Sequence, residues 1–354
     1  MLGLSFTEDF RQAVSMIFNL SPYLLADAYD IVTKRLDAGC SQNSDPENMD
    51  FALGSSCLQT FSQLSSSSIS RWEEAALCAM LGQLLLAYTA MSPLGTSTRH
   101  VTRATLLAIR DWYPAMLEHP RLHTLLITLV CVDTIDCLLR RDLPILRLPT
   151  LSRPSCDRLA GVCTSLLPLL YDLCECSYRM RVEVLPTKIS RGSQDEHDPY
   201  SDVEQGIHDW TPSTPPGFWA DYTAQEQKAM FVQARTYRLA ALLIIHRLRF
   251  PLGIQGTAAR SLASAILDDI AELKSWPPDG ATGLGLDFPL LVAAVEMPQR
   301  GVELFGSFDR LRFRKRHLDR IEDFVRTLHE ARGNQYSGSW LDFVEDHFVG
   351  DLLP

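Results

Sequence analysis

Two ionisable residues that lie among apolar neighbours are the first candidates for chemistry. His246 shares a helical face with three leucines of the two preceding turns, so its imidazole is expected on the inner side of a helix. Glu296 ends the apolar run Phe288-Pro-Leu-Leu-Val-Ala-Ala-Val-Glu296. A polar group in such a setting needs a hydrogen-bonding partner, and it is a candidate for general acid–base catalysis or for binding a polar ligand. A core histidine that a neighbour satisfies remains the alternative for His246.

Three more charged residues belong to the same hypothesis. Asp133 and Asp136 stand one helical turn apart in an apolar segment, and Arg249 follows His246 by less than a turn. We therefore predict a pocket for a small polar ligand, which is lined by a set of five residues. We assign no catalytic residue. The set consists of His246, Arg249, Glu296, Asp133 and Asp136.

Motifs with a fixed spacing are absent from the sequence. It contains no His-Glu-x-x-His, no phosphate-binding Walker loop and no nucleophile elbow. The pair Gly283 and Gly285 resembles the start of a dinucleotide fingerprint, but Phe288 stands where its third glycine is required. No cysteines have the paired two-residue spacing of a tetrahedral metal site. The sequence therefore predicts neither a cofactor nor a metal.

Composition limits the remaining classes of protein. The chain has 354 residues, of which 46% are hydrophobic, and a formal net charge of −10. That charge is unfavourable for holding a phosphate backbone, so we expect no direct binding of nucleic acid by this chain. We find no secretory signal and expect no membrane-spanning segment. Nine scattered cysteines are typical of a reducing, intracellular compartment.

Apolar residues recur at helical spacing along most of the chain, which predicts an all-α fold. We expect an irregular array of about ten helices around a common core. Residues 40–70 are rich in serine and asparagine and predict a surface connection. Residues 186–221 predict a long ordered loop that joins two helical halves, 1–185 and 222–354, of a single domain, 1–354. The predicted helices span 7–36, 71–92, 99–118, 121–141, 156–183, 222–249, 257–275, 286–306, 314–332 and 339–349.

Several segments, taken in order, resemble the fungal-specific transcription factor domain, which in its family follows a binuclear zinc-cluster DNA-binding module. The resemblance covers nearly the whole chain. It implies an α-helical fold and a role in regulating gene expression, through a pocket that senses a metabolite or through contacts with other regulators. The segments that carry it are Asp133-Thr-Ile-Asp136, Arg140-Arg-Asp-Leu-Pro144, Ile207-His-Asp-Trp210, Leu243-Ile-Ile-His-Arg247, Trp276-Pro277, Phe288 to Glu296, and Trp340.

The chain departs from the family because it lacks the six-cysteine zinc cluster. Cys40, Cys57 and Cys78 are too far apart to form one. One hypothesis is a regulatory domain, either cut from a longer factor or acting as a stand-alone co-regulator. Such a domain is expected in the nucleus, binds a small-molecule metabolite or another regulatory protein, and does not bind DNA by itself. Alternatively, the chain is a stand-alone cytoplasmic enzyme or ligand-binding protein of secondary metabolism that needs no cofactor. A homodimer is compatible with either hypothesis.

Overall fold

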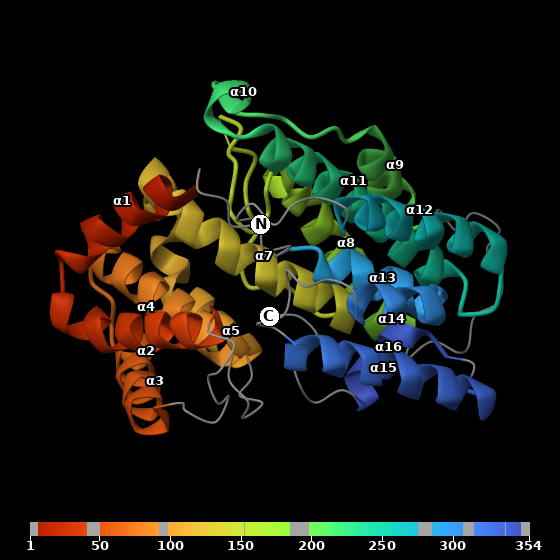
Figure 1. Cartoon of the computed structure of the whole chain (residues 1–354), viewed down its shortest axis with the longest axis horizontal. Helices are drawn as coiled ribbons and strands as arrows, with labels where there is room; N and C mark the ends of the chain where they lie inside the picture. Colours follow the sequence, from red (N-terminus) through yellow and green to blue (C-terminus); the bar gives the residue numbers. More distant parts are fainter. Residues whose placement is uncertain are drawn as a thin grey trace.

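The computed structural model describes residues 6–40, 50–91, 98–151, 153–184, 198–274, 285–306, 315–336 and 338–347. Within these ranges the chain is helical, with α-helices labelled α1 to α16 and no named β-strand (Figure 1). The all-α fold class is therefore confirmed. The array has more helices than the number expected, because several predicted segments are divided and two lie in segments predicted as loops.

The first eight α-helices cover the part of the chain before the gap at residues 185–197. They are α1 (Thr7–Phe18), α2 (Pro22–Cys40), α3 (Phe51–Ser66), α4 (Trp72–Met91), α5 (Thr98–Ile109), α6 (Tyr113–Leu117), α7 (His123–Arg140) and α8 (Leu167–Val184). The second group follows that gap. It consists of α9 (Ser201–Asp209), α10 (Phe218–Asp221), α11 (Ala224–Arg249), α12 (Gly256–Lys274), α13 (Asp287–Glu296), α14 (Pro298–Gly306), α15 (Lys315–Gly333) and α16 (Trp340–His347).

Helix α7 lies in the middle of the array, between α1 to α5 on one side and α11 to α16 on the other (Figure 1). Every residue from Leu125 to Leu139 is buried. Residues 120–140 are long and apolar enough to cross a membrane, with a mean hydropathy of 1.8, but 83% of that window is buried within the protein. The apolar character of α7 is thus explained by packing on both sides.

Two predictions in the first half are corrected. Residues 40–70 are not only a connection, because α3 occupies 51–66 and is capped by Asp50, whose carboxylate accepts the amide N–H of Leu53 at 2.9 Å; residues 41–49 lie outside the described residues. Only Gly54, Cys57 and Phe61 of this helix are buried, which is too narrow a stripe to stand out against its serines. The predicted helix 7–36 is divided after Phe18, and α2 starts at a proline, which suits a first helical position.

Prolines explain most of the other differences. Helix α8 starts at Leu167, not at 156, because Pro168 lacks a backbone N–H and is tolerated in the first turn of a helix but not in the interior of a longer one. The predicted helix 286–306 is divided between α13 and α14, because Pro298 cannot donate a backbone hydrogen bond to the preceding turn. The predicted loop 186–221 contains α9 and α10 in its described part, 198–221, whereas residues 186–197 lie outside the described residues.

Helix α11 begins with a capping box. The Thr223 side chain accepts the amide N–H of Glu226, and the Glu226 carboxylate accepts the amide N–H of Thr223 at 2.8 Å. From this start α11 runs for 26 residues and packs against α12 and α13. Its last turns carry His246, Arg247 and Arg249, and so it positions three charged or titratable side chains at one end of the array.

Candidate functional site

The buried cation at the end of α11 is Arg247, and its partner is Glu296 at the end of α13. The guanidinium Nε lies 2.5 Å from Oε1 and Nη2 lies 2.6 Å from Oε2, while the side chains are 1% and 5% exposed. The third nitrogen, Nη1, donates to the backbone carbonyls of Phe250, Pro251 and Ile254. This two-pronged pair gives Glu296 the partner that its apolar surroundings require.

His246 does not join this pair. Its side chain is half-buried, its Nε2 lies 3.3 Å from the carbonyl oxygen of Gln255, and its ring lies against Phe250 at 5.2 Å. Burial, followed by the charge of the adjacent Arg247, lowers the pKa of the imidazole. The inner face of the helix that the sequence assigns to His246 is therefore occupied by the next residue, Arg247.

Arg249 connects α11 to the segment that directly follows the gap at 185–197. Its guanidinium forms ion pairs with Asp198 and, at 2.7 Å, with Glu204 of α9. The side chain is 22% exposed, so this pair lies at the edge of the protein. Arg249 thus fixes α9 against the end of α11 instead of facing a shared cavity with Glu296.

Asp133 and Asp136 of α7 belong to a second charged cluster, which includes Arg99 and Arg103 of α5. Arg103 Nη1 lies 3.2 Å from Asp133 Oδ1, and the amide N–H of Ile145 donates to Asp133 Oδ2 at 2.6 Å. Asp136 pairs with Arg99 and also accepts from Arg140 at 3.0 Å. Burial raises the pKa of Asp133, against the opposing effects of the Ile145 and Arg103 contacts.

Four of the five predicted residues therefore lie in three ion-pair groups with different partners, and His246 contacts the carbonyl oxygen of Gln255 instead. Glu296 pairs with Arg247, Arg249 with α9, and the two aspartates with α5. The cavity beside the aspartates has a volume of only about 10 Å³, which is about one water molecule. A second cavity, lined by Tyr237, Asp287 and Phe288, has about 30 Å³. In this part of the chain the charged groups hold helices together and leave little room for a ligand.

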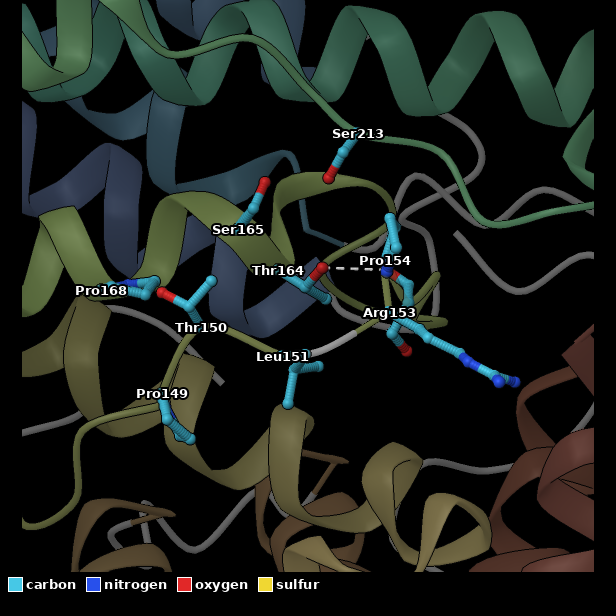
Figure 2. A pocket seen from close by; sticks show the side chains of 10 residues that line it. Pro149, Thr150, Leu151, Arg153, Pro154, Thr164, Ser165, Pro168 and Ser213 are labelled. Atoms are coloured by element: carbon cyan, nitrogen blue, oxygen red, sulfur yellow. Dashed lines mark hydrogen bonds between the residues drawn. The ribbon is translucent and has the colours of Figure 1, made fainter.

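A larger pocket lies where the sequence indicates none, between the segment before α8 and the segment after α9 (Figure 2). It has a volume of about 100 Å³. Its walls combine proline rings with the hydroxyl groups of serine and threonine; the residues include Pro149, Thr150, Pro154, Ser165, Pro168 and Ser213. We refer to it as the hydroxyl–proline pocket. Its lining offers several hydrogen-bonding groups and rigid apolar surfaces, but no acid–base pair.

Hydrogen bonds fix two sides of the hydroxyl–proline pocket. Trp210, which directly follows α9, donates its indole N–H to Ser165 Oγ at 3.1 Å. The Thr164 hydroxyl donates to the backbone carbonyl of Ser155 at 2.9 Å. Figure 2 shows the hydroxyls of Ser165 and Ser213 directed toward each other, whereas Arg153 extends away from the other lining residues.

Comparison with known families gives one result. The sequence model of the fungal specific transcription factor domain matches residues 22–346, which is most of the chain. This chain belongs to the fungal specific transcription factor domain family. The resemblance inferred from its motifs is therefore confirmed, and membership gives the domain a role in the regulation of transcription. No curated protein and no solved structure matches the sequence.

In this fungal transcription factor domain, three of the segments that carry the resemblance supply side chains that join helices or connecting segments. Asp133-Thr-Ile-Asp136 anchors α5 and α7, Leu243 to Arg247 provides the cation for Glu296, and Trp210 closes the segment beside Ser165. The sequence singled out the two aspartates and Glu296 because charges are conspicuous in apolar surroundings, but it assigned to His246 the inner position that Arg247 occupies. Sequence reasoning missed the hydroxyl–proline pocket because prolines and hydroxyls on a connecting segment are typical of any surface loop.

Proposed function

We propose that this domain is the regulatory part of a fungal transcription regulator, that it works in the nucleus through contact with another regulatory protein, and that this chain does not bind DNA itself. The family match over residues 22–346 is the observation that carries the proposal. The charges, the exposed aromatic residues and the cavities support its finer parts.

The charge distribution supports the absence of DNA binding by this chain. Its net charge is −10, and binding to DNA requires cationic groups that displace counterions from phosphates. Many described arginines already have carboxylate partners within the fold, which leaves fewer of them for phosphates. Among these are Arg99, Arg103, Arg140, Arg141, Arg247 and Arg249.

An exposed aromatic group supports contact with a protein. Trp219 of α10 is 68% exposed and stacks on Phe231 of α11 at 5.8 Å, with Phe218 packed edge-on beside it. Exposed tryptophans on a rigid support are frequent energetic centres of protein interfaces. The three cavities described above, at about 100 Å³ or less, are smaller than the roughly 300 Å³ or more of pockets that enclose a whole metabolite.

A tethering experiment tests the proposal. The chain is fused to an unrelated DNA-binding module upstream of a reporter gene in a fungal host, and transcription is compared with that of the module alone. We expect a change in reporter output that Trp219→Ala reduces at equal protein levels. Ile254→Ala is the matched control, since Ile254 is also about half exposed but stands apart from the aromatic cluster. Unaltered output from the wild-type fusion would contradict the regulatory role.

The proposed absence of DNA binding needs a separate measurement on the isolated chain. Fluorescence anisotropy of a labelled duplex is followed at low ionic strength, where contacts with phosphates are strongest. We expect no rise in anisotropy at protein concentrations in the micromolar range. Salt-dependent binding would show that this chain contacts nucleic acid directly.

A small-molecule signal is the second candidate, because the hydroxyl–proline pocket is large enough for a small polar group. Native mass spectrometry of the chain after exposure to a fungal metabolite extract tests it. We expect any adduct to be lost in Ser165→Val and kept in Ser264→Val, which changes a hydroxyl on α12. An adduct that both variants retain would place the ligand elsewhere.

A further inference from the structure

The segment from Trp210 to Gly217, Trp-Thr-Pro-Ser-Thr-Pro-Pro-Gly, joins α9 to α10 and forms one wall of the hydroxyl–proline pocket through Ser213. We call it the proline segment. Both of its flanks are anchored, since Trp210 is 9% exposed and Phe218 is 1% exposed. Between these anchors, residues 211–215 form no helix or strand. The backbone at its first residue is extended, with φ −65° and ψ 134°.

Two threonines of the proline segment are each followed directly by proline, and the structure treats them differently. The side chain of Thr211 is exposed, whereas that of Thr214 is half-buried. Protein kinases bind the acceptor residue in an irregular or extended stretch, and the proline-directed kinases select a proline directly after it, where the missing N–H is tolerated. We propose that Thr211 is a phosphorylation site for a proline-directed serine/threonine kinase, and that Thr214 in the folded domain is not.

The reaction uses ATP bound by the kinase. The Thr211 hydroxyl oxygen forms a bond to the γ-phosphorus, and the bond between that phosphorus and the β–γ bridging oxygen breaks. ADP leaves with the bond electrons, and the hydroxyl proton passes to the catalytic carboxylate of the kinase. The domain supplies only the hydroxyl group and the proline that follows it.

The position of Thr211 gives the modification a structural effect. It lies two residues after Asp209, the last residue of α9, where the helix dipole is negative and a carboxylate is already present. A phosphate carries about −1.5 to −2 charges at neutral pH, and at a helix C-terminus it is destabilising. The neighbouring residue is Trp210, whose indole holds Ser165. We infer that phosphorylation loosens α9 and the Trp210 contact and so opens the wall of the hydroxyl–proline pocket.

Labelling in vitro tests the site. The folded chain is incubated with a purified cyclin-dependent or mitogen-activated protein kinase and ATP, and the phosphorylated residue is located by tandem mass spectrometry. Because the chain also contains Ser21-Pro22 and Ser92-Pro93, labelling is scored separately at each residue, and we expect phosphate on Thr211. The label is lost in Thr211→Ala, kept in Thr211→Ser and unaffected by Thr214→Ala. In a synthetic peptide of residues 205–220 both threonines become acceptors, because nothing buries Thr214. Failure of the folded chain to accept phosphate, or equal labelling of the two threonines in it, would overturn the proposal.

Hydrogen–deuterium exchange tests the effect. We expect amides of residues 198–217 to exchange about two- to fivefold faster in the phosphorylated chain, which is the change expected of an unfavourable charge at a helix end. Exchange in α12 should stay constant, and phosphatase treatment should restore the original rates. Unchanged exchange in 198–217 would exclude the loosening. The regulatory meaning of this change rests on the proposed function. Because neither measurement here uses reporter output, a failure of the phosphorylation proposal is distinguishable from a failure of the proposed function.

Discussion

Arg247 and Glu296 join the ends of α11 and α13 by two parallel hydrogen bonds, and the pair is almost completely buried. Removing one partner leaves the other as an uncompensated charge in the core. We therefore expect Arg247→Met to lower the free energy of unfolding by about 3–5 kcal/mol. Unfolding in urea, followed by far-ultraviolet circular dichroism, measures the change.

Two further variants show whether the loss comes from the unpaired charge. The double variant Arg247→Met with Glu296→Leu removes both charges and should recover most of the stability, since apolar replacements of buried pairs are often tolerated. Arg326→Ala breaks the exposed pair with Asp323 and should change stability by less than about 0.5 kcal/mol. A double variant no better than the single one would attribute the effect to lost packing.

Asp157 connects pH to stability. Its side chain is 1% exposed, and its Oδ1 accepts the amide N–H groups of Leu159 and Ala160 at 2.8 and 2.9 Å. Burial raises the pKa of this carboxyl above its ordinary value of 3.8, although the two hydrogen bonds oppose the shift. Between the ordinary and the raised pKa the folded state keeps a proton that the unfolded chain has lost. The contribution of Asp157 to stability is thus complete at lower pH and falls as pH rises through that window.

Asp157→Asn should remove this pH dependence and retain the turn, because the amide oxygen still accepts both N–H groups. We expect the unfolding free energy of the variant to vary less with pH over the acidic range and to exceed that of the wild type at neutral pH. Asp157→Ala should flatten the dependence equally but lose about 1–3 kcal/mol at every pH, because two buried donors lose their acceptor. Parallel pH profiles for the wild type and Asp157→Asn would refute this account.

Two tryptophans of neighbouring segments should respond differently to the same substitution. Trp210→Phe removes the indole donor to Ser165 and should lower the free energy of unfolding by about 0.5–1.5 kcal/mol, with no further loss when Ser165→Ala is added. Trp219→Phe keeps an aromatic ring on an exposed site and should cost less than about 0.5 kcal/mol. Differential scanning calorimetry on Trp210→Phe, Ser165→Ala, their double variant and Trp219→Phe measures these effects, and additive losses at Trp210 and Ser165 would exclude their coupling.

Helices with a wide buried stripe are predictable from sequence periodicity, whereas short helices with few buried residues are not. Helices α7 and α11 are long and apolar over several turns, so their periodicity alone predicted them. Helix α9 is short, and Ile207 is its one buried residue, so its polar sequence resembled a loop. Tertiary packing against α8 and α11 stabilises such a helix, and no local pattern contains that information.

The candidate site shows a similar division. The apolar run before Glu296 correctly predicted that its carboxylate has a partner. That this partner is Arg247 depends on how α11 crosses α13, and sequence periodicity does not contain that information. One residue of helix is about 100° of rotation, so a small error in the inner face exchanged His246 for Arg247. The hydroxyl–proline pocket arises from two segments far apart in sequence, 149–168 and 213, and only their meeting creates it.

Gly285 and Gly333 should respond in opposite directions to alanine. At Gly285 the backbone φ is +81°. A Cβ there would lie 2.5 Å from the backbone carbonyl oxygen of Leu159 and 2.3 Å from the side-chain nitrogen Nε2 of Gln233. Gly285→Ala should therefore cost more than about 1 kcal/mol, from the left-handed backbone and the contact with rigid main chain. Gly333 ends α15 with open space where a Cβ would stand, so Gly333→Ala should stabilise by about 0.5–1 kcal/mol. Urea unfolding of both variants measures the two signs, and a neutral Gly285→Ala would show that the turn at Leu159 yields to a methyl group.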